Sequence, residues 1–292
     1  DGWNKRIQKF TSDGIFLTKW GSNGSGDGQF TSPYGLAVDA AGNIFVADAS
    51  TNERIQKFTS DGAFLAKWGK PGQVGSVKEE PGDVSFWSPS GIDIDSNGFI
   101  YVADMGNNRI QKLGADGNAI KKWGTKGTRA GEFSTPFDVA VYSENIYVTD
   151  YYNNRVQKFT SDGVFLGMWG KPGTEDGAFQ YPAPIAVDAL GNVFVAELNN
   201  NRIQKFTTDG KFITKRGAPG TGAGQFNQPR GMAISADGKV YVTDILNNRV
   251  QRFRIETYEP AKIPQRITKL PILKKPFVHP GEPRTNPRLR LR

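Results

Sequence analysis

The sequence predicts an all-β protein built from a repeated four-stranded unit, and three observations indicate it. A segment of the form Asn-Xaa-Arg, an aliphatic residue, Gln, Lys or Arg, and then Phe or Leu occurs six times, with its arginines 48, 55, 46, 47 and 47 residues apart. Short runs rich in Val, Ile, Phe and Tyr alternate with Gly-Asn and Asp-Gly turns, and no helical period is visible. With 35 Gly, 17 Pro and no Cys in 292 residues, the composition excludes a coiled coil, a collagen and a disulfide-rich scaffold.

Each full unit contains four short strands, which we name a to d in chain order. In the second unit, strand a (35–39) follows a proline, and a Gly-Asn turn leads to strand b (44–48). Strand c (54–58) is the arginine segment, and a Ser-Asp-Gly turn leads to strand d (64–68). Four-stranded units of about 40 to 50 residues are typical of the blades of a β-propeller.

The repeated motifs resemble those of a known family. Pro-x-Gly-φ-Ala-Val-Asp, Gly-Asn-φ-φ-Val-Ala-Asp and Asn-Asn-Arg-φ-Gln-Lys-Phe, where φ is apolar, recur in register along residues 1–254 and look like NHL repeats. The resemblance implies a β-propeller, commonly six-bladed. Residues 1–254 are therefore predicted to form one propeller domain.

The repeat does not end on whole units. Asp1 aligns with Asp48 and Asp104 at the end of strand b, so the first unit supplies only strands c and d, and the last unit ends after its strand c near Arg254. Six c strands but five a strands predict a six-bladed ring with about half a blade upstream of the given sequence, through a truncated or processed N-terminus. A five-bladed ring with a displaced terminal strand is the alternative.

One face of the propeller is predicted to carry function. The chain reverses at every turn, so the b–c and d–a loops share one end of each blade, and these loops vary in length and chemistry. Apolar and aromatic residues recur directly after the strand-b acid and after the proline that precedes strand a, which favours an exposed binding patch over catalysis. The alternative is that these side chains lie beneath neighbouring loops. The predicted partner-binding residues of this face are Tyr34, Met105, Phe137, Tyr151, Leu198, Arg230 and Ile245.

An acid at the end of strand b and an arginine at the start of strand c recur in every unit. One short loop brings the two together, and a guanidinium can bridge a carboxylate and loop carbonyls. A structural role is predicted, because a ligand site would not need to recur in each blade; Glu197 is the one departure from Asp. The pairs are Asp48 with Arg54, Asp104 with Arg109, Asp150 with Arg155, Glu197 with Arg202, and Asp244 with Arg249.

Two segments imitate other sites. Asp93, Asp95, Asn97, Gly98 and Asp104 match the ligand spacing of an EF-hand, but no helix flanks them and they occupy an ordinary a–b turn. The glycine cluster 21–28 lacks the helix and the Gly-Lys-Ser or Gly-Lys-Thr of a phosphate loop, so it is interpreted as a connection between blades.

The residue inventory argues against catalysis. The chain has no Cys and a single His, His279, so a Ser-His-Asp relay or a His-bound zinc cannot lie in the propeller. Amidating lyases that resemble this propeller use His-bound zinc, so that carry-over fails here, whereas lactonase-like propellers use calcium held by Asp, Asn and Glu. We expect no enzyme, no cofactor and no metal, with a calcium-dependent lactonase-like hydrolase as an alternative.

Residues 255–292 are predicted to form an extended basic arm. They carry nine Lys or Arg against three Glu, a net +6, whereas residues 1–254 carry 28 basic and 26 acidic groups, a net +2. The prolines prevent helix and regular strand pairing, and the apolar content favours docking on another protein surface over packing on the chain's own propeller. The predicted contact residues of the arm are Lys262, Arg266, Lys274, Lys275 and Arg284.

Together these observations predict a non-enzymatic protein-binding scaffold or accessory subunit of a larger assembly. RNA binding, which some NHL propellers perform, is the alternative, but the nearly neutral propeller disfavours it. No segment has the roughly 18 apolar residues of a membrane span. The resemblance to surface NHL propellers of microbes favours an extracellular or cell-surface location.

Overall fold

The computed structural model describes residues 1–72 and 84–254. The predicted arm, with Lys262, Arg266, Lys274, Lys275 and Arg284, lies outside the described residues. No helix in the described ranges is long and apolar enough to cross a membrane.

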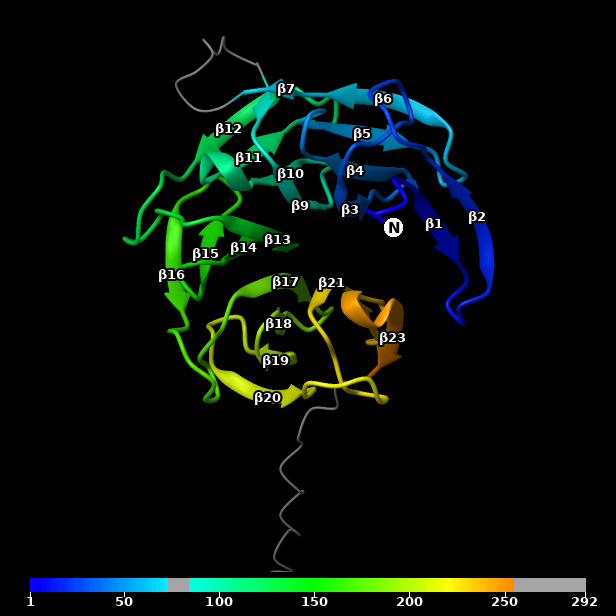
Figure 1. Ribbon diagram of the computed structural model, residues 1–292. Helices are drawn as coiled ribbons and strands as arrows, with labels where there is room; N and C mark the ends of the chain where they lie inside the picture. The colour runs from blue at the N-terminus through cyan, green and yellow to red at the C-terminus, as the bar shows by residue number, and fades with distance from the viewer. Residues whose placement is uncertain (73–83, 255–292) are drawn as a thin grey trace, which may run out of the picture. The chain divides into compact units, whose positions relative to one another are not determined.

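The described chain is an all-β propeller of antiparallel sheets arranged around a central axis, as predicted (Figure 1). Four repeat sheets have four strands, the first has two and the last has three. The innermost strands pack side by side in chain order. They are β3 (Pro33–Val38), β9 (Pro89–Ile94), β13 (Pro136–Tyr142), β17 (Pro182–Val187) and β21 (Pro229–Ile234).

The second strands are buried in all but the last sheet, apart from Asn145 at the start of β14, because a neighbouring sheet covers each of their faces. These strands are β4 (Ile44–Asp48), β10 (Ile100–Asp104), β14 (Asn145–Asp150), β18 (Val193–Glu197) and β22 (Val240–Asp244). The third strands carry the arginine segment. They are β1 (Ile7–Phe10), β5 (Arg54–Phe58), β11 (Arg109–Leu113), β15 (Arg155–Thr160), β19 (Arg202–Phe206) and β23 (Arg249–Phe253).

The outermost strands are β2 (Phe16–Trp20), β6 (Phe64–Trp68), β12 (Ala119–Trp123), β16 (Phe165–Trp169) and β20 (Phe212–Arg216). Short 3-10 turns, η1 (Met105–Asn107) and η2 (Ile245–Asn247), follow β10 and β22. A small parallel pair, β7 (Lys70–Pro71) with β8 (Ser85–Phe86), flanks the long insertion. The segment that imitates an EF-hand is the β9–β10 turn, in which Asp95 Oδ1 accepts hydrogen bonds from the backbone N–H groups of Asn97 and Phe99.

The ring closes from the last sheet to the first. Lys112 on β11 reaches Asp162 in the turn of the following sheet, with Nζ 3.4 Å from Oδ1. The equivalent residue of the last sheet, Arg252, reaches Asp13 in the β1–β2 turn, with Nη1 2.9 Å from Oδ1. Because β1 and β2 form a sheet of their own and do not pair with β23, the alternative of a five-bladed ring with a displaced strand is not observed.

The core lies between adjacent sheets. One cluster joins Tyr101 and Ile110 of one sheet to Val139 and Ile146 of the next, and similar clusters occur at the other boundaries. Phe133, in the connection between these two sheets, is fully buried in it. Gly124, at this connection, must be glycine, because its φ is +102° and a Cβ there would lie 2.6 Å from the Phe133 ring.

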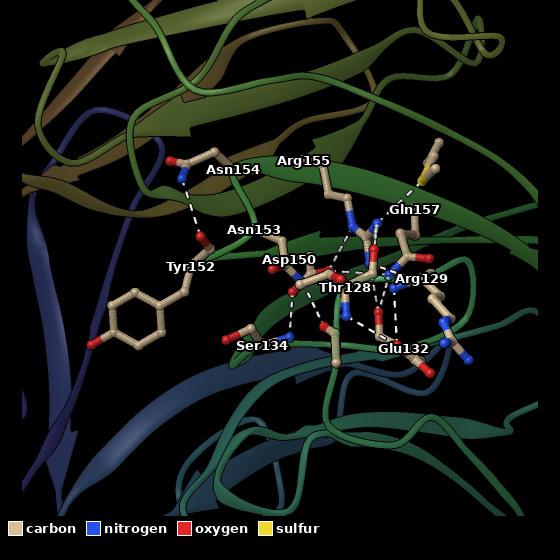
Figure 2. A network of polar contacts seen from close by, with 12 residues as sticks. Thr128, Arg129, Glu132, Ser134, Asp150, Tyr152, Asn153, Asn154, Arg155 and Gln157 are labelled. Carbon is tan, nitrogen blue, oxygen red and sulfur yellow. Dashed lines mark hydrogen bonds and ion pairs between the residues drawn. The ribbon is translucent and has the colours of Figure 1, made fainter.

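A buried polar network joins the loops of the sheet β13–β16 (Figure 2). Asp150 Oδ2 accepts hydrogen bonds from Asn153 Nδ2 at 2.8 Å, Arg155 Nε at 2.8 Å and Gln157 Nε2 at 3.1 Å. The same guanidinium donates to the carbonyls of Thr128, Arg129 and Glu132 at 2.6, 2.8 and 2.7 Å. Burial raises the pKa of Asp150, and the bonds from Asn153 and Arg155 oppose that shift.

Every unit contains this arrangement. The closest distances from arginine Nε to the acid are 3.3 Å for Arg54 with Asp48, 2.8 Å for Arg109 with Asp104, 2.6 Å for Arg202 with Glu197 and 2.8 Å for Arg249 with Asp244. In the first unit Asp1 occupies the place of the strand-b acid and accepts from Asn4, Arg6 and Gln8. The glutamate of the Glu197 pair is therefore accommodated with the same partners as an aspartate.

Glu53 and Lys5 depart from the asparagine of a second repeated position. Asn108, Asn154 and Asn201 hold left-handed φ angles and accept a backbone N–H of the following sheet through their side-chain oxygens. Glu53 takes this place, with φ +46°, and its Oε2 accepts the N–H of Ser88 at 2.6 Å. The pKa of Glu53 is raised to about 7, mainly by burial and to a smaller extent by the carboxylates of Asp104 and Asp48, while the bond from Ser88 opposes the shift.

Replacing Arg155 by Ala is expected to lower the free energy of unfolding by about 3–5 kcal/mol, because it leaves the Asp150 carboxylate buried without its cation and frees three loop carbonyls. Urea unfolding measures the change. Arg249→Ala is the matched control: it removes the same kind of contacts, but the Arg249 side chain is 30% exposed against 8% for Arg155, so a smaller loss is expected. Equal losses for the two variants would contradict burial as the cause.

Replacing Glu53 by Asn is expected to stabilise the protein at pH 8 and to have less effect at pH 5. The folded-state pKa of Glu53 is raised from 4.5 to about 7, so the folded state binds the proton more tightly and the parent loses stability as pH rises between these values. Asn cannot ionise and tolerates the left-handed backbone. Unfolding free energies at several pH values give the difference, which should grow by about 1–3 kcal/mol from pH 5 to pH 8. A difference independent of pH would contradict the assignment.

Candidate functional site

The innermost strands begin at one end of the propeller, and the residues that follow their first prolines surround the axis there. These are Tyr34, Ser90, Phe137, Ala183 and Arg230. The residues after the strand-b acids lie in the adjoining loops. We call this end of the axis the mouth, and the side chains described below form it.

An aromatic cluster fills part of the mouth. The Phe137 ring stacks on Tyr151 with centroids 5.6 Å apart, and Tyr151 stacks on Tyr181 at 4.9 Å. Tyr34 packs edge-on against Phe137 at 6.4 Å. Tyr152 contacts both Tyr151 and Tyr181 edge-on. Rings from three units therefore meet in one continuous surface, a geometry that favours flat ligands.

Arg230 lies on this aromatic surface. Its guanidinium carbon is 5.1 Å from the Tyr34 ring centroid and 5.7 Å from that of Phe137, within the range of cation–π attraction. Its Nη2 donates to the Tyr34 hydroxyl at 2.5 Å. Within the described residues it forms no ion pair, and its Nε is buried without a hydrogen-bond partner. The arginines of the repeated network, in contrast, each have a carboxylate, so Arg230 contributes a positive charge that no carboxylate of the described chain neutralises.

A pocket of about 260 Å³ opens beside the cluster. Tyr34 and Met105 belong to the pocket wall, and the other lining residues are Ser32, Ala49, Ser50, Ser88, Pro89 and Ser90. Four serines give this wall hydroxyl groups that donate and accept hydrogen bonds. Glu53, whose carboxyl accepts the Ser88 N–H, fixes one side of the pocket from behind.

The ionisation of Tyr151 is shifted by its place in the cluster. Burial raises the pKa of its hydroxyl, and the neighbouring Tyr152 raises it further, while the Arg230 charge opposes the shift. Tyr151 is therefore neutral at physiological pH and acts as a hydrogen-bond donor or acceptor.

The structure brings together six of the seven residues predicted on this face. Tyr34, Phe137, Tyr151 and Arg230 are linked by ring contacts, and Met105 and Leu198 pack in the same apolar cluster. Phe137 and Leu198 are only 7% exposed, so these two lie beneath their neighbours, which was the alternative interpretation. Ile245 follows the strand-b acid of the last sheet and is not part of that cluster.

Sequence reasoning missed Tyr181 and Tyr152. Tyr181 directly precedes the proline of β17, where other units have Ser, Thr or Gln, and Tyr152 is the second residue after the strand-b acid. A comparison of the residues at these two positions in all the repeats would have found both aromatic side chains. The described residues contain no group of three or more His, Cys, Asp or Glu side chains that could hold a metal ion.

Family models match most of the repeats. The NHL repeat model matches residues 30–58, 86–113 and 133–159, and a model described as a 6-bladed beta-propeller matches residues 173–280. No curated protein sequence matches the chain.

Solved structures share the fold at low sequence identity. Streptogramin B lyase has a TM-score of 0.54 and 19% identity, covering 77% of this chain and 70% of its own. A catalytically inactive His-to-Ala variant of virginiamycin B lyase from Staphylococcus aureus, solved with quinupristin, has a TM-score of 0.57 and 19% identity, covering 87% and 78%. A protein of unknown function from Bacteroides caccae has a TM-score of 0.58 and 15% identity, covering 83% and 80%.

These structures correct the functional prediction. The prediction of a non-enzymatic protein-binding scaffold is wrong, because the solved structures of this fold include lyases. The residue inventory tested for only a few types of catalytic site, and a fold can carry many others. At 15–19% identity the likeness establishes the architecture and leaves the activity of this chain open. The matching models and the architecture confirm the predicted β-propeller with NHL repeats.

Proposed function

We propose that the protein binds a small, flat organic anion, such as an aromatic carboxylate, at the mouth of the propeller. The observation that carries the proposal is Arg230, a cation without a carboxylate partner among the described residues, held against the rings of Tyr34 and Phe137. A guanidinium has five N–H donors in a planar fork that matches a carboxylate, and Arg230 donates one of them to the Tyr34 hydroxyl.

The surroundings of Arg230 support a ligand with one or two rings. The stacked rings of Tyr151 and Tyr181, with the buried Phe137 packed behind Tyr151, provide a flat apolar wall, and the adjoining pocket of about 260 Å³ offers serine hydroxyls. An apolar concave surface with a few converging polar groups is the usual character of a small-molecule site. The scaffold beneath it is rigid, because each loop is held by a buried acid–arginine network.

Lyases of the same fold provide a precedent for small-molecule chemistry on a propeller, and the proposal for this chain concerns recognition of the ligand. The Tyr151 hydroxyl and the Glu53 carboxyl are two ionisable groups at the mouth and its supporting loops whose pKa values are raised. Chromatography of the recovered ligand after incubation with the protein shows whether it returns unchanged or converted.

Titration calorimetry tests the proposal with benzoate, naphthoate and indole carboxylates and with their neutral amides. We expect saturable binding of one or more carboxylates and weaker binding of the matching amide. Arg230→Met, which keeps the length of the side chain and removes its charge, is expected to weaken carboxylate binding at least about tenfold, or about 1.4 kcal/mol.

Arg216→Met is the matched control. Arg216 also lies over an aromatic ring, 4.9 Å from the Phe253 centroid, but on an outer strand away from the mouth. The Arg216→Met variant should bind the carboxylates as the parent does. If no carboxylate binds, or if Arg230→Met and the parent bind equally, the proposal is wrong.

A further inference from the structure

Within residues 1–72 and 84–254, the outer strands β2, β6, β12, β16 and β20 end their sheets, so each has one edge that no described strand pairs with. A free strand edge can pair with a strand of another chain, and charged side chains, lysine above all, prevent this. Four of these strands carry a lysine one residue before their last position. The lysines are Lys19, Lys67, Lys122 and Lys215.

The strand β16 has Met168 at the lysine position. Its sequence, Phe-Leu-Gly-Met-Trp, contains no charge, whereas each of the other four outer strands in the described chain contains at least one. Val164, Leu166 and Met168 are 59%, 50% and 50% exposed. Since Leu166 and Met168 alternate with the half-buried Phe165 and Trp169, they lie on the same side of the strand.

A second replacement accompanies the first. Lys67 Nζ pairs with Asp27 Oδ1 at 2.6 Å, and Lys215 Nζ pairs with Asp176 Oδ1 at 2.6 Å. Each of these acids directly precedes a glycine whose N–H is bound by the glutamine of strand c. In the sheet of β16 that glycine is Gly131, and the residue before it is the exposed Ala130. Two other sheets each have an exposed Lys–Asp ion pair here. In the sheet of β16, Met168 replaces the lysine and Ala130 replaces the aspartate.

The local geometry favours close approach of another strand. Gly167 lies at the centre of β16, and a Cβ there would meet nothing within 4 Å, so the backbone is accessible from that side. The Met168 sulfur accepts a hydrogen bond from Arg155 Nη1 at 3.3 Å, which orders this side chain on the outer strand. Figure 2 shows Arg155 in its network. An uncharged strand with ordered, exposed apolar side chains has the character of a pairing edge.

We propose that β16 pairs edge to edge, antiparallel, with β16 of a second copy of this chain. A two-fold symmetric contact places each edge against itself, so an edge bearing lysine would oppose like charges, while β16 opposes apolar side chains. Among the described outer strands, only β16 meets this requirement for self-pairing. A five-residue strand gives a small interface, so the dimer is weak and depends on concentration.

Sedimentation velocity of the full chain, over about two decades of protein concentration, tests the proposal. The parent is expected to shift from monomer to dimer. Met168→Lys is expected to raise the dimer dissociation constant at least about tenfold, and the double variant A130D/M168K, which restores the ion pair of the other sheets, should do the same. Circular dichroism and thermal unfolding check that the single and the double variant remain folded. If Met168→Lys does not fold, Leu166→Lys replaces it in the sedimentation experiment.

Leu65→Lys is the matched control, because Leu65 is 48% exposed on β6 and takes the place that Leu166 takes on β16. It should leave association unchanged. The reverse change, D27A/K67M, makes β6 resemble β16 and is expected to produce species larger than a dimer. A parent that stays monomeric throughout, or a dimer that Met168→Lys does not weaken, overturns the proposal.

Discussion

The buried carboxylate at the end of each second strand is the feature on which the rest of the propeller depends. A carboxylate away from water requires charged or polar donors, and an Asn and an Arg supply them in each unit, joined by a Gln in most, as Asp150 illustrates. The same guanidinium then binds carbonyls of the connection from the preceding sheet. One interaction therefore fixes two loops, and it does so without consuming any functional residue of the mouth.

Because this frame repeats, the residues that do not repeat gather in defined places. The first residues of the innermost strands surround the axis, so side chains from distant parts of the chain meet there; Arg230 and Tyr34 are 196 residues apart and share a hydrogen bond. The outer strands collect variation in the same way at the rim. Side chains can thus vary on the innermost and the outermost strand of each sheet, where a changed side chain does not disturb the core.

The core itself is uniform. Aromatic residues from the connections, such as Phe133 and Phe179, fill the same site at successive sheet boundaries, and the second strands are covered on both faces. Apolar burial on both sides of a sheet tolerates few polar atoms, which explains why the buried carboxyls each have a dense set of hydrogen-bond donors. Glu53 departs from the asparagine of its equivalents, and the consequence is a carboxyl that ionises near neutral pH.

The sequence by itself determined the four-stranded unit, the limits of strands b, c and d, and the pairing of each acid with its arginine, whereas strand a begins and ends earlier than predicted, at Pro33–Val38. These depend on local periodicity and on loops of four or five residues, so they can be predicted from neighbouring positions. Only the tertiary structure decided that Phe137 and Leu198 are buried, that Tyr181 joins the aromatic cluster, and that Arg230 lies against Tyr34. Those contacts join different sheets around the axis, and their distances depend on how the ring closes, which no segment of the sequence specifies locally.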